Sequence, residues 1–274
     1  VNPNPMVGCV IVYNDQIIGE GYHKYYGGNH AEVEAVNDAY KRGNNDLLNK
    51  SSMYVTLEPC FHYGKTPPCV DLIIRHEIKK VFISIEDPNI LVAGKSIKKL
   101  INHGIHVEVG LLEEEAKLQN KFFMHFIKYK KPYVIYKSAS SLDGKIAPVS
   151  GKSRWISSLE SRKRVHEIRN NVMGILTTSA TLMKDNPSLN VRHVEKIADP
   201  TPIILDRHMV LSKELKIFSV HKRVIVFTSN KINILSNKCS DNTKIIKVNE
   251  TNNGLELNEV INELGQMGFD FIMV

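Results

Sequence analysis

Apolar and polar positions alternate in short blocks along the first half of the chain. Runs rich in valine and isoleucine predict β-strands, and apolar residues spaced three or four positions apart predict helices. The predicted strands cover residues 6–13, 16–22, 52–57, 81–85 and 106–109. The predicted helices cover residues 30–40, 69–77, 96–103 and 113–129. Asn14 and Asp15, between the first two strands, predict a hairpin turn.

The second half continues this alternation. Its predicted strands cover residues 133–139, 172–177, 202–205, 223–227 and 269–274, and its predicted helices cover 160–170, 180–184 and 255–264. Strands that alternate with helices are typical of α/β units with mostly parallel sheets, so we predict this class for both halves. A polar run ends at Pro132, and it predicts a boundary between a domain of residues 1–131 and one of residues 132–274.

Composition agrees with a globular chain and excludes few functions. The chain has 274 residues, of which 42% are hydrophobic and 24% charged, and this length favours two domains. A net charge of +7 suits phosphate-bearing partners, although composition alone favours a solvated lysine-rich surface. The basic residues are scattered, so we expect no nucleic-acid partner. The sequence contains neither a signal peptide nor an apolar run of the ~18 residues that a membrane helix needs, which predicts a cytoplasmic protein without a membrane partner.

In a reducing compartment, cysteines are metal ligands, nucleophiles or core residues rather than disulfides. His30 begins a predicted helix, Cys60 follows a predicted strand, and Cys69 begins another helix. One imidazole and two thiolates form a zinc set that leaves the fourth tetrahedral position to water. Glu32 lies two residues after His30 and is placed to move protons between that water and a leaving amine. This order of residues predicts the zinc site of a hydrolytic deaminase.

Each residue has a simpler explanation when it is taken alone. A histidine at a helix start is often a cap, and two cysteines nine positions apart are often buried thiols. Their combination, with Pro59 directly before Cys60, favours the metal site. Cys9 lies in an apolar strand and is predicted to belong to the core, whereas Cys239 lies in a polar region and supports no function.

Several motifs resemble the bifunctional deaminase–reductase family of riboflavin biosynthesis. In the first half these are Asn-Pro-Met-Val-Gly at 4–8, His-Ala-Glu-Val at 30–33, Thr-Leu-Glu-Pro-Cys at 56–60 and Gly-Lys-Thr-Pro-Pro-Cys at 64–69. The eight residues between the two cysteines match this family and distinguish the chain from cytidine and transfer-RNA deaminases. In the second half, residues 140–145, 153–156 and 177–192 resemble the reductase domain.

The resemblance implies two successive reactions and two folds. The first domain would have a cytidine-deaminase-like three-layer α/β/α fold, and zinc in it would remove an amine from a ribosylamino-pyrimidinone 5′-phosphate. The second would have a dihydrofolate-reductase-like α/β fold, and NADPH in it would reduce the ribosyl side chain to ribityl. The family also implies a homo-oligomer.

The resemblance also assigns roles to individual residues. In the deaminase half, Asn4, His62 and Lys65 would bind the substrate. In the reductase half, the substrate-binding positions are Ser153, Arg169, Leu189 and Arg192. The NADPH-binding positions are Ala139, Trp155, Thr181, Asp185 and Arg207. Arginine suits a 5′-phosphate because its guanidinium forms paired, charge-assisted hydrogen bonds.

The chain departs from the family at both ends. It lacks the helix that normally precedes Asn2, and it stops at Val274, before the glycine-rich turn that holds the coenzyme phosphates. We therefore expect a truncated reductase domain, and a chain that retains zinc binding better than reductase activity.

Two other functions remain open at this stage. A zinc deaminase of another base or nucleoside would use the same metal site, but it would not need the second α/β domain. A non-enzymatic protein with structural zinc would need a fourth protein ligand. Replacing Glu32 with glutamine separates a catalytic from a structural site, because only a catalytic site loses ammonia release while it keeps zinc.

Overall fold

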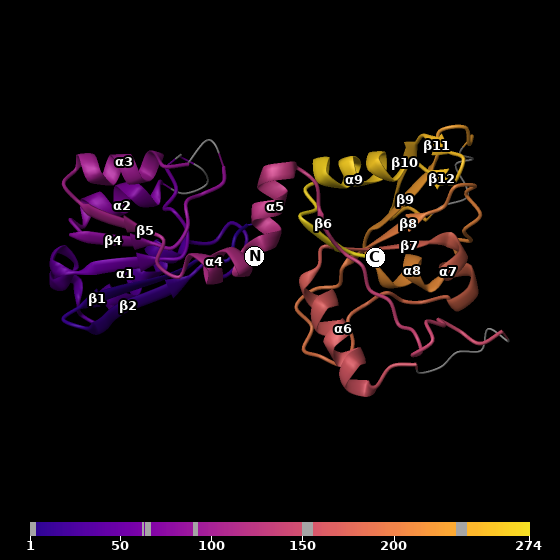
Figure 1. Ribbon diagram of the computed structural model, residues 1–274, viewed down its shortest axis with the longest axis horizontal. Coiled ribbons are helices and arrows are strands. Elements are labelled where there is room, and N and C mark those ends of the chain that lie inside the picture. Colours follow the sequence, from indigo (N-terminus) through magenta and orange to yellow (C-terminus); the bar gives the residue numbers. More distant parts are fainter. Residues whose placement is uncertain (1–3, 62, 64–66, 90–92, 150–155, 234–239) are drawn as a thin grey trace. The chain divides into compact units, whose positions relative to one another are not determined.

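A computed structural model describes residues 4–61, 63, 67–89, 93–149, 156–233 and 240–274. The chain divides into two compact units, Val1–Tyr129 and Lys130–Val274, which we describe separately. Both units contain sheets and helices, so the α/β class predicted for each half is confirmed (Figure 1). In the described residues, no helix is long and apolar enough to cross a membrane.

The first unit is built on a mixed five-stranded sheet in the order β2-β1-β3-β4-β5. Its strands are β1 (Gly8–Tyr13), β2 (Gln16–Tyr22), β3 (Ser52–Val55), β4 (Lys80–Ile83) and β5 (His106–Val109). Its helices are α1 (Ala31–Lys41), the 3-10 helix Asn45–Lys50, α2 (Cys69–Arg75), α3 (Lys95–Asn102), α4 (Glu113–Gln119) and α5 (Lys121–Tyr129). The predicted hairpin forms, because β1 pairs antiparallel with β2 through the turn at Asn14 and Asp15. The pairs β3–β4 and β4–β5 are parallel.

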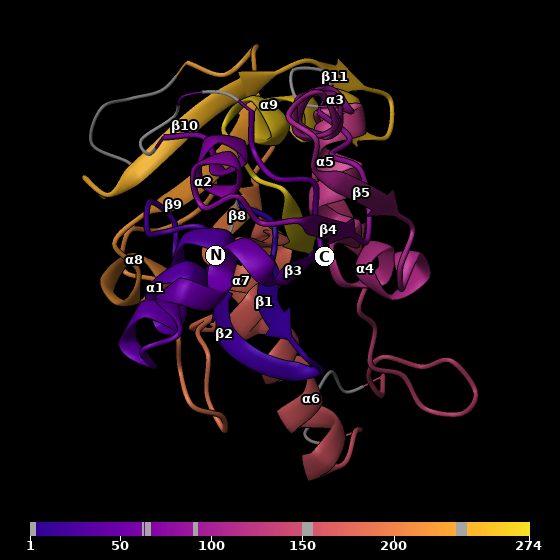
Figure 2. The same ribbon diagram turned by 90° about the vertical axis from the view of Figure 1, so that its left-hand side faces the viewer.

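The core of the first unit lies on one face of this sheet. Alternate strand positions, such as Ile11, Met53 and Val81, form one buried cluster with apolar residues of α1, α2 and α3, so these three helices cover the same face (Figures 1 and 2). On the opposite face, the rings of Tyr54 and Phe82 stack 4.5 Å apart. This arrangement brings the amino-terminal ends of α1 and α2 toward the end of β3.

Two glycines let α1 approach the edge strand β2. A Cβ atom on Gly19 would lie 2.4 Å from the carbonyl oxygen of Ala35, and one on Gly21 would lie 2.4 Å from the backbone nitrogen of Ala35. Only glycine leaves room for such an approach. The position of α1 therefore depends on the Gly-Glu-Gly sequence of β2.

The single helix predicted over residues 113–129 is wrong, because α4 and α5 are separate. They meet at Asn120, whose side chain is buried and holds the backbone of Met6. The Met6 N–H donates to Oδ1 of Asn120 at 2.8 Å, and Nδ2 of Asn120 donates to the Met6 carbonyl at 2.9 Å. An asparagine whose side chain bonds distant backbone favours a helix boundary over a helix interior. The amphipathic pattern of the segment carries no sign of this contact.

The second unit contains a six-stranded sheet in the order β10-β9-β8-β7-β13-β6, and its described strand pairs are all parallel. Its strands are β6 (Tyr133–Ile135), β7 (Gly174–Thr178), β8 (Thr201–Leu205), β9 (Val224–Ser229), β10 (Thr243–Val248) and β13 (Phe271–Met273), with a small hairpin of β11 (Glu250–Thr251) and β12 (Gly254–Leu255). Its helices are α6 (Leu159–Asn171), α7 (Ser179–Asp185), α8 (Lys216–Val220) and α9 (Leu257–Gln266).

Burial in the second unit explains why its strands have continuous apolar runs. Every residue of β9 is buried, as expected for a central parallel strand covered on both faces. Val260 and Leu264 of α9 pack against one face, and α7 and α8 lie on the other side of the sheet (Figure 1). The pattern of the chain predicts most of these elements but misses α8, β10 and the β11–β12 hairpin, which are short or rich in lysine and polar residues.

Candidate active site

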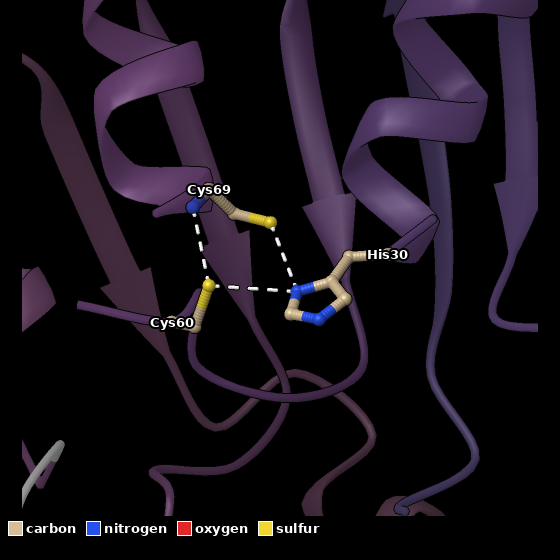
Figure 3. A group of neighbouring side chains, drawn as sticks. All are labelled: His30, Cys60 and Cys69. Atoms are coloured by element: carbon tan, nitrogen blue, oxygen red, sulfur yellow. Dashed lines mark hydrogen bonds between the residues drawn. The ribbon is translucent and has the colours of Figure 1, made fainter. Parts of the chain in front are cut away.

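Three backbone segments bring His30, Cys60 and Cys69 together (Figure 3). His30 caps the amino-terminal end of α1, and Cys69 is the first residue of α2. Cys60 lies in the loop after β3. Their ligand atoms lie within 4.8 Å of one another. Among the described residues this is the one group of three or more histidine, cysteine or acidic side chains that could hold a metal ion.

The buried carboxylate of Glu58 fixes the loop that carries Cys60. It accepts hydrogen bonds from the backbone N–H groups of Asp87, Gly94 and Ser96 at 3.2, 2.9 and 3.1 Å. The Ser96 hydroxyl also donates to the carbonyl of Pro59, the residue directly before Cys60. Charge-assisted bonds of this kind are stronger than neutral ones. Glu58 therefore has a structural role within the Thr-Leu-Glu-Pro-Cys motif.

The three side chains fit a zinc ion. Nδ1 of His30 lies 3.4 Å from Sγ of Cys60 and 3.3 Å from Sγ of Cys69. Tetrahedral zinc with Zn–S of about 2.3 Å and Zn–N of about 2.0 Å sets nitrogen and sulfur about 3.5 Å apart. The separations agree with this value, and the donor set has the nitrogen and sulfur chemistry that zinc prefers.

The surroundings favour a thiolate on Cys60, whereas the hydrogen bond to Cys60 and burial raise the pKa of Cys69. A hydrogen bond from Cys69 lowers the pKa of Cys60 to about 4. The backbone N–H of Cys69 also donates to Sγ of Cys60 at 3.2 Å. Cys60 is therefore a thiolate at neutral pH, the form that binds metal. The third described cysteine, Cys9, is buried in the core as predicted.

Glu32 projects from the first turn of α1 into the same region and is only 3% exposed. Burial raises the pKa of its carboxyl to about 7. It also hydrogen-bonds the Cys69 side chain, so it lies beside the candidate ligands. A carboxyl that titrates near neutral pH can both take and give a proton, which suits general acid–base work.

A cavity of about 270 Å³ opens beside these residues. Asn4, His30, Glu32 and Cys60 line it, so the structure brings a predicted substrate-binding residue to the candidate metal site. Phe123, from α5, contributes an apolar part of the wall. The cavity has the size and mixed lining of a small-molecule site.

His23 lines this cavity and is missing from the predicted site. Its Nδ1 lies 2.9 Å from the carbonyl oxygen of Asn29, which can only accept, so Nδ1 carries the proton. Its Nε2 therefore accepts from Nδ2 of Asn4 at 3.0 Å, which orients the Asn4 amide. The position of His23 directly after β2, close to the loop before His30, is the only signal of this role in the sequence.

Four of the predicted site residues, His62, Lys65, Ser153 and Trp155, lie outside the described residues. In the second unit, a cavity of about 290 Å³ brings together Ala139, Arg169 and Arg192. Leu189 is buried in the same segment as Arg192 but is not among the residues that line this cavity. The family resemblance assigns Ala139 to coenzyme and the two arginines to substrate, and these positions share one cavity.

The other predicted coenzyme residues follow the carboxyl ends of parallel strands. Thr181 and Asp185 lie on α7, directly after β7, and Arg207 lies two residues after β8. Ligands of open parallel sheets bind at this edge, and the hydroxyl and carboxylate of α7 suit the hydroxyl groups of a nucleotide. The Arg207 guanidinium is engaged, because its Nε lies 3.1 Å from a carboxylate oxygen of Glu250.

Comparison with known proteins places both units in described families. Residues 132–274 match the RibD C-terminal domain, and residues 2–85 match the zinc-binding region of cytidine and deoxycytidylate deaminases. The chain is 38% identical over 273 residues to the riboflavin biosynthesis protein RibD of Aquifex aeolicus, covering 100% of this chain and 74% of that protein. It is 45% identical over 217 residues to RibD of Bacillus amyloliquefaciens, covering 79% of this chain and 57% of that protein.

A solved structure supports the same assignment. A diaminohydroxyphosphoribosylaminopyrimidine deaminase/5-amino-6-(5-phosphoribosylamino)uracil reductase from Thermotoga maritima superposes with a TM-score of 0.89 at 42% identity. The match covers 100% of this chain and 75% of that one. RibD of Acinetobacter baumannii also matches, with a TM-score of 0.88 and 36% identity.

Proposed function

The chain belongs to the RibD family of riboflavin biosynthesis proteins, and on this premise we propose that it catalyses two successive steps on a phosphorylated pyrimidine. The first unit removes an amine from 2,5-diamino-6-ribosylamino-4(3H)-pyrimidinone 5′-phosphate. The second reduces the ribosyl chain of the product to ribityl with NADPH. The observation that carries the proposal is the group of His30, Cys60 and Cys69, with Glu32 beside it in one cavity.

In the first step, His30, Cys60 and Cys69 would hold zinc. Zinc, when bound there, supplies a water that is acidic enough to act as a nucleophile at neutral pH. Asn4, oriented by His23, holds the edge of the pyrimidine ring in the cavity. The Asn4 amide keeps its oxygen and one N–H for the ring, because its other N–H is engaged by His23.

Glu32 moves the protons of this reaction. Its carboxylate takes a proton from the attacking water, and its carboxyl then gives a proton to the departing amine. The bond from the pyrimidine C2 to the amine nitrogen breaks, a carbonyl forms at C2, and ammonia leaves. A pKa of about 7 lets the same group serve in both directions.

In the second step, Arg169 and Arg192 bind the 5′-phosphate of the substrate. Both arginines line the cavity of the second unit, and arginine keeps its charge at neutral pH. Ala139, Thr181 and Asp185 take the coenzyme at the carboxyl edge of the sheet. NADPH, when bound, supplies the hydride.

The two steps are tested by incubating the chain, loaded with zinc, with the diamino-pyrimidinone phosphate. We expect ammonia release without NADPH, and we expect any NADPH oxidation to follow the formation of the deaminated product. A matched assay with cytidine and deoxycytidylate should release no ammonia. Release from cytidine or deoxycytidylate but not from the phosphorylated pyrimidine would contradict the proposed substrate.

We further propose that the chain acts in the cytoplasm as a homo-oligomer. The candidate metal site needs reduced thiols, which a reducing compartment maintains. Sedimentation of the purified protein tests the assembly, and a single species with the mass of one chain would refute it.

A further inference from the structure

Residues 186–193, the segment that carries Leu189 and Arg192, form no helix or strand, and side chains from elsewhere in the unit hold them in place. Asn186, Leu189 and His193 all have positive φ angles, of 40°, 50° and 65°. Asparagine and histidine enter this region more readily than other residues, so the positive φ of Leu189 is the one that marks backbone held by surrounding contacts. The bonds that this segment makes to the rest of the unit therefore decide where the Arg192 side chain lies.

Two consecutive backbone N–H groups of the segment are bonded to side chains from elsewhere in the unit. The N–H of Val191 donates to Oδ1 of Asp199 at 2.8 Å, and the N–H of Arg192 donates to Nδ1 of His166 at 3.0 Å. His166 lies on α6 and is 5% exposed. The Arg192 N–H thus reaches an imidazole that is almost fully buried.

This bond defines the protonation state of His166. A backbone N–H can only donate, so Nδ1 of His166 carries no proton and the neutral ring has its proton on Nε2. Burial, together with the positive charges of Arg169 and Arg192 and with His193, lowers the pKa of His166 to about 4. The ring is therefore neutral at physiological pH, and Nδ1 is available as an acceptor.

His166 also lies where the two predicted phosphate ligands meet. Arg169 follows it by three residues on α6, close to the same side of the helix. Nη1 of Arg169 reaches the Asn190 carbonyl at 3.4 Å, a second and longer bond between α6 and the segment. His166, Arg169 and Arg192 all line the cavity of about 290 Å³.

We propose that His166 is a positioning residue of the reductase site, which uses its Nδ1 acceptor to anchor the Arg192 backbone to α6. The bond holds the two guanidinium groups at one cavity, where they take the phosphate of a sugar phosphate. This inference rests on the proposed function, because it assumes that Arg169 and Arg192 bind that phosphate. It gives His166 a role that comes from one nitrogen atom rather than from the bulk of the ring.

The test compares His166→Asn with His166→Gln in the full chain. The side-chain oxygen of asparagine can occupy the place of Nδ1, whereas that of glutamine reaches toward the place of Nε2. Binding of ribose 5-phosphate is measured by titration calorimetry. We expect H166Q to weaken binding about tenfold, the loss that follows when a buried N–H is left without its acceptor, and H166N to stay near wild type. Asparagine is the poorer helix former, so helix propensity alone predicts the opposite order.

Two controls separate this inference from the proposed function. Arg169→Gln tests the phosphate site itself, and Arg164→Gln changes an exposed position on the same helix. Ribose 5-phosphate binding that is unchanged in R169Q, or absent in the wild type, would overturn the proposed phosphate site. The positioning role is tested once R169Q binds ribose 5-phosphate weakly and R164Q binds it like the wild type. Equal affinities of H166N and H166Q for this ligand, whether both are reduced or both unchanged, would then overturn the positioning role. Tight binding by H166N with weak binding by H166Q supports it.

Discussion

Replacing Gly21 with alanine should displace α1, the helix that positions His30 and Glu32 in the candidate zinc site. Gly21 lies in β2 beneath the first turns of α1, and its φ angle is not positive, so alanine suits the backbone itself. The added methyl group points at α1. Its Cβ would lie 2.4 Å from the backbone nitrogen of Ala35, 2.6 Å from Cβ of Glu34 and 2.7 Å from the carbonyl oxygen of Ala31.

The size of the displacement follows from these distances. Ordinary contacts of a Cβ atom begin near 3.4 Å, so α1 must move away by as much as 1.0 Å. Two of the three atoms belong to helix backbone, which cannot rotate aside as a side chain can. Overpacking of this kind costs about 1–3 kcal/mol of folding free energy.

His30 and Glu32 move with α1, whereas Cys60 and Cys69 belong to other segments. Metal–ligand distances vary by only ~0.2 Å in well-formed sites, so a shift near 1 Å separates His30 from the thiols. We expect zinc affinity to fall at least about tenfold, comparable to the loss of a supporting side chain around a metal.

The assay measures zinc affinity by competition with a chromophoric chelator, together with thermal unfolding. Gly8→Ala is the matched control, because a Cβ on Gly8 meets only Cγ2 of Thr56 at 4.0 Å. G8A should bind zinc like the wild type. Wild-type zinc affinity and stability in G21A would refute the close approach of α1 to β2 as the feature that positions His30.

Three further predictions concern charge and metal. Asp270 is 2% exposed, and burial raises the pKa of its carboxyl to about 6 from 3.8. The protonated carboxyl therefore stabilises the fold fully below pH 3.8, and this contribution is lost as the pH rises through about 6. At pH 8, Asp270→Asn should raise the free energy of unfolding by ~3 kcal/mol and the melting temperature with it, whereas below pH 4 it should unfold like the wild type. Arg207 lowers the pKa of Glu250 to about 2 from 4.5, so this ion pair stabilises the fold above pH 4.5 and is lost as the pH falls toward 2. Between pH 4.5 and pH 2, the melting temperature of Glu250→Gln should therefore fall less steeply than that of the wild type. Chelation of zinc should lower the melting temperature of the first unit and leave that of the second unchanged, because bound metal stabilises only the unit that holds it; equal shifts in both units would contradict this.

The sequence predicts well wherever local pattern and packing agree. The strand over residues 16–22 and the helix beginning near His30 follow from apolar spacing, and β2 and α1 lie there. The division of the long segment at Asn120 could not be predicted, because its cause is a pair of bonds to Met6, more than a hundred residues away along the chain. The sequence does not predict β10, because lysines interrupt its apolar positions at an edge of the sheet.

The candidate site shows the same division. The order of His30, Glu32, Cys60 and Cys69 is enough to predict zinc chemistry, because few other functions need these residue types in this arrangement. The role of His23 could not be predicted, since it depends on which ring nitrogen faces Asn29 and which faces Asn4. Ion pairs between residues far apart in the sequence also cannot be predicted from it. Arg207, a predicted coenzyme-binding residue, forms such a pair with Glu250.

Ammonia release by Glu32→Gln, measured together with zinc content, tests the central claim most directly. Glutamine keeps the shape of the side chain but cannot carry a proton between water and amine. The account predicts that E32Q retains zinc as the wild type does and releases ammonia from the phosphorylated pyrimidine at least ~100-fold more slowly. Ammonia release at the wild-type rate by zinc-loaded E32Q would contradict it.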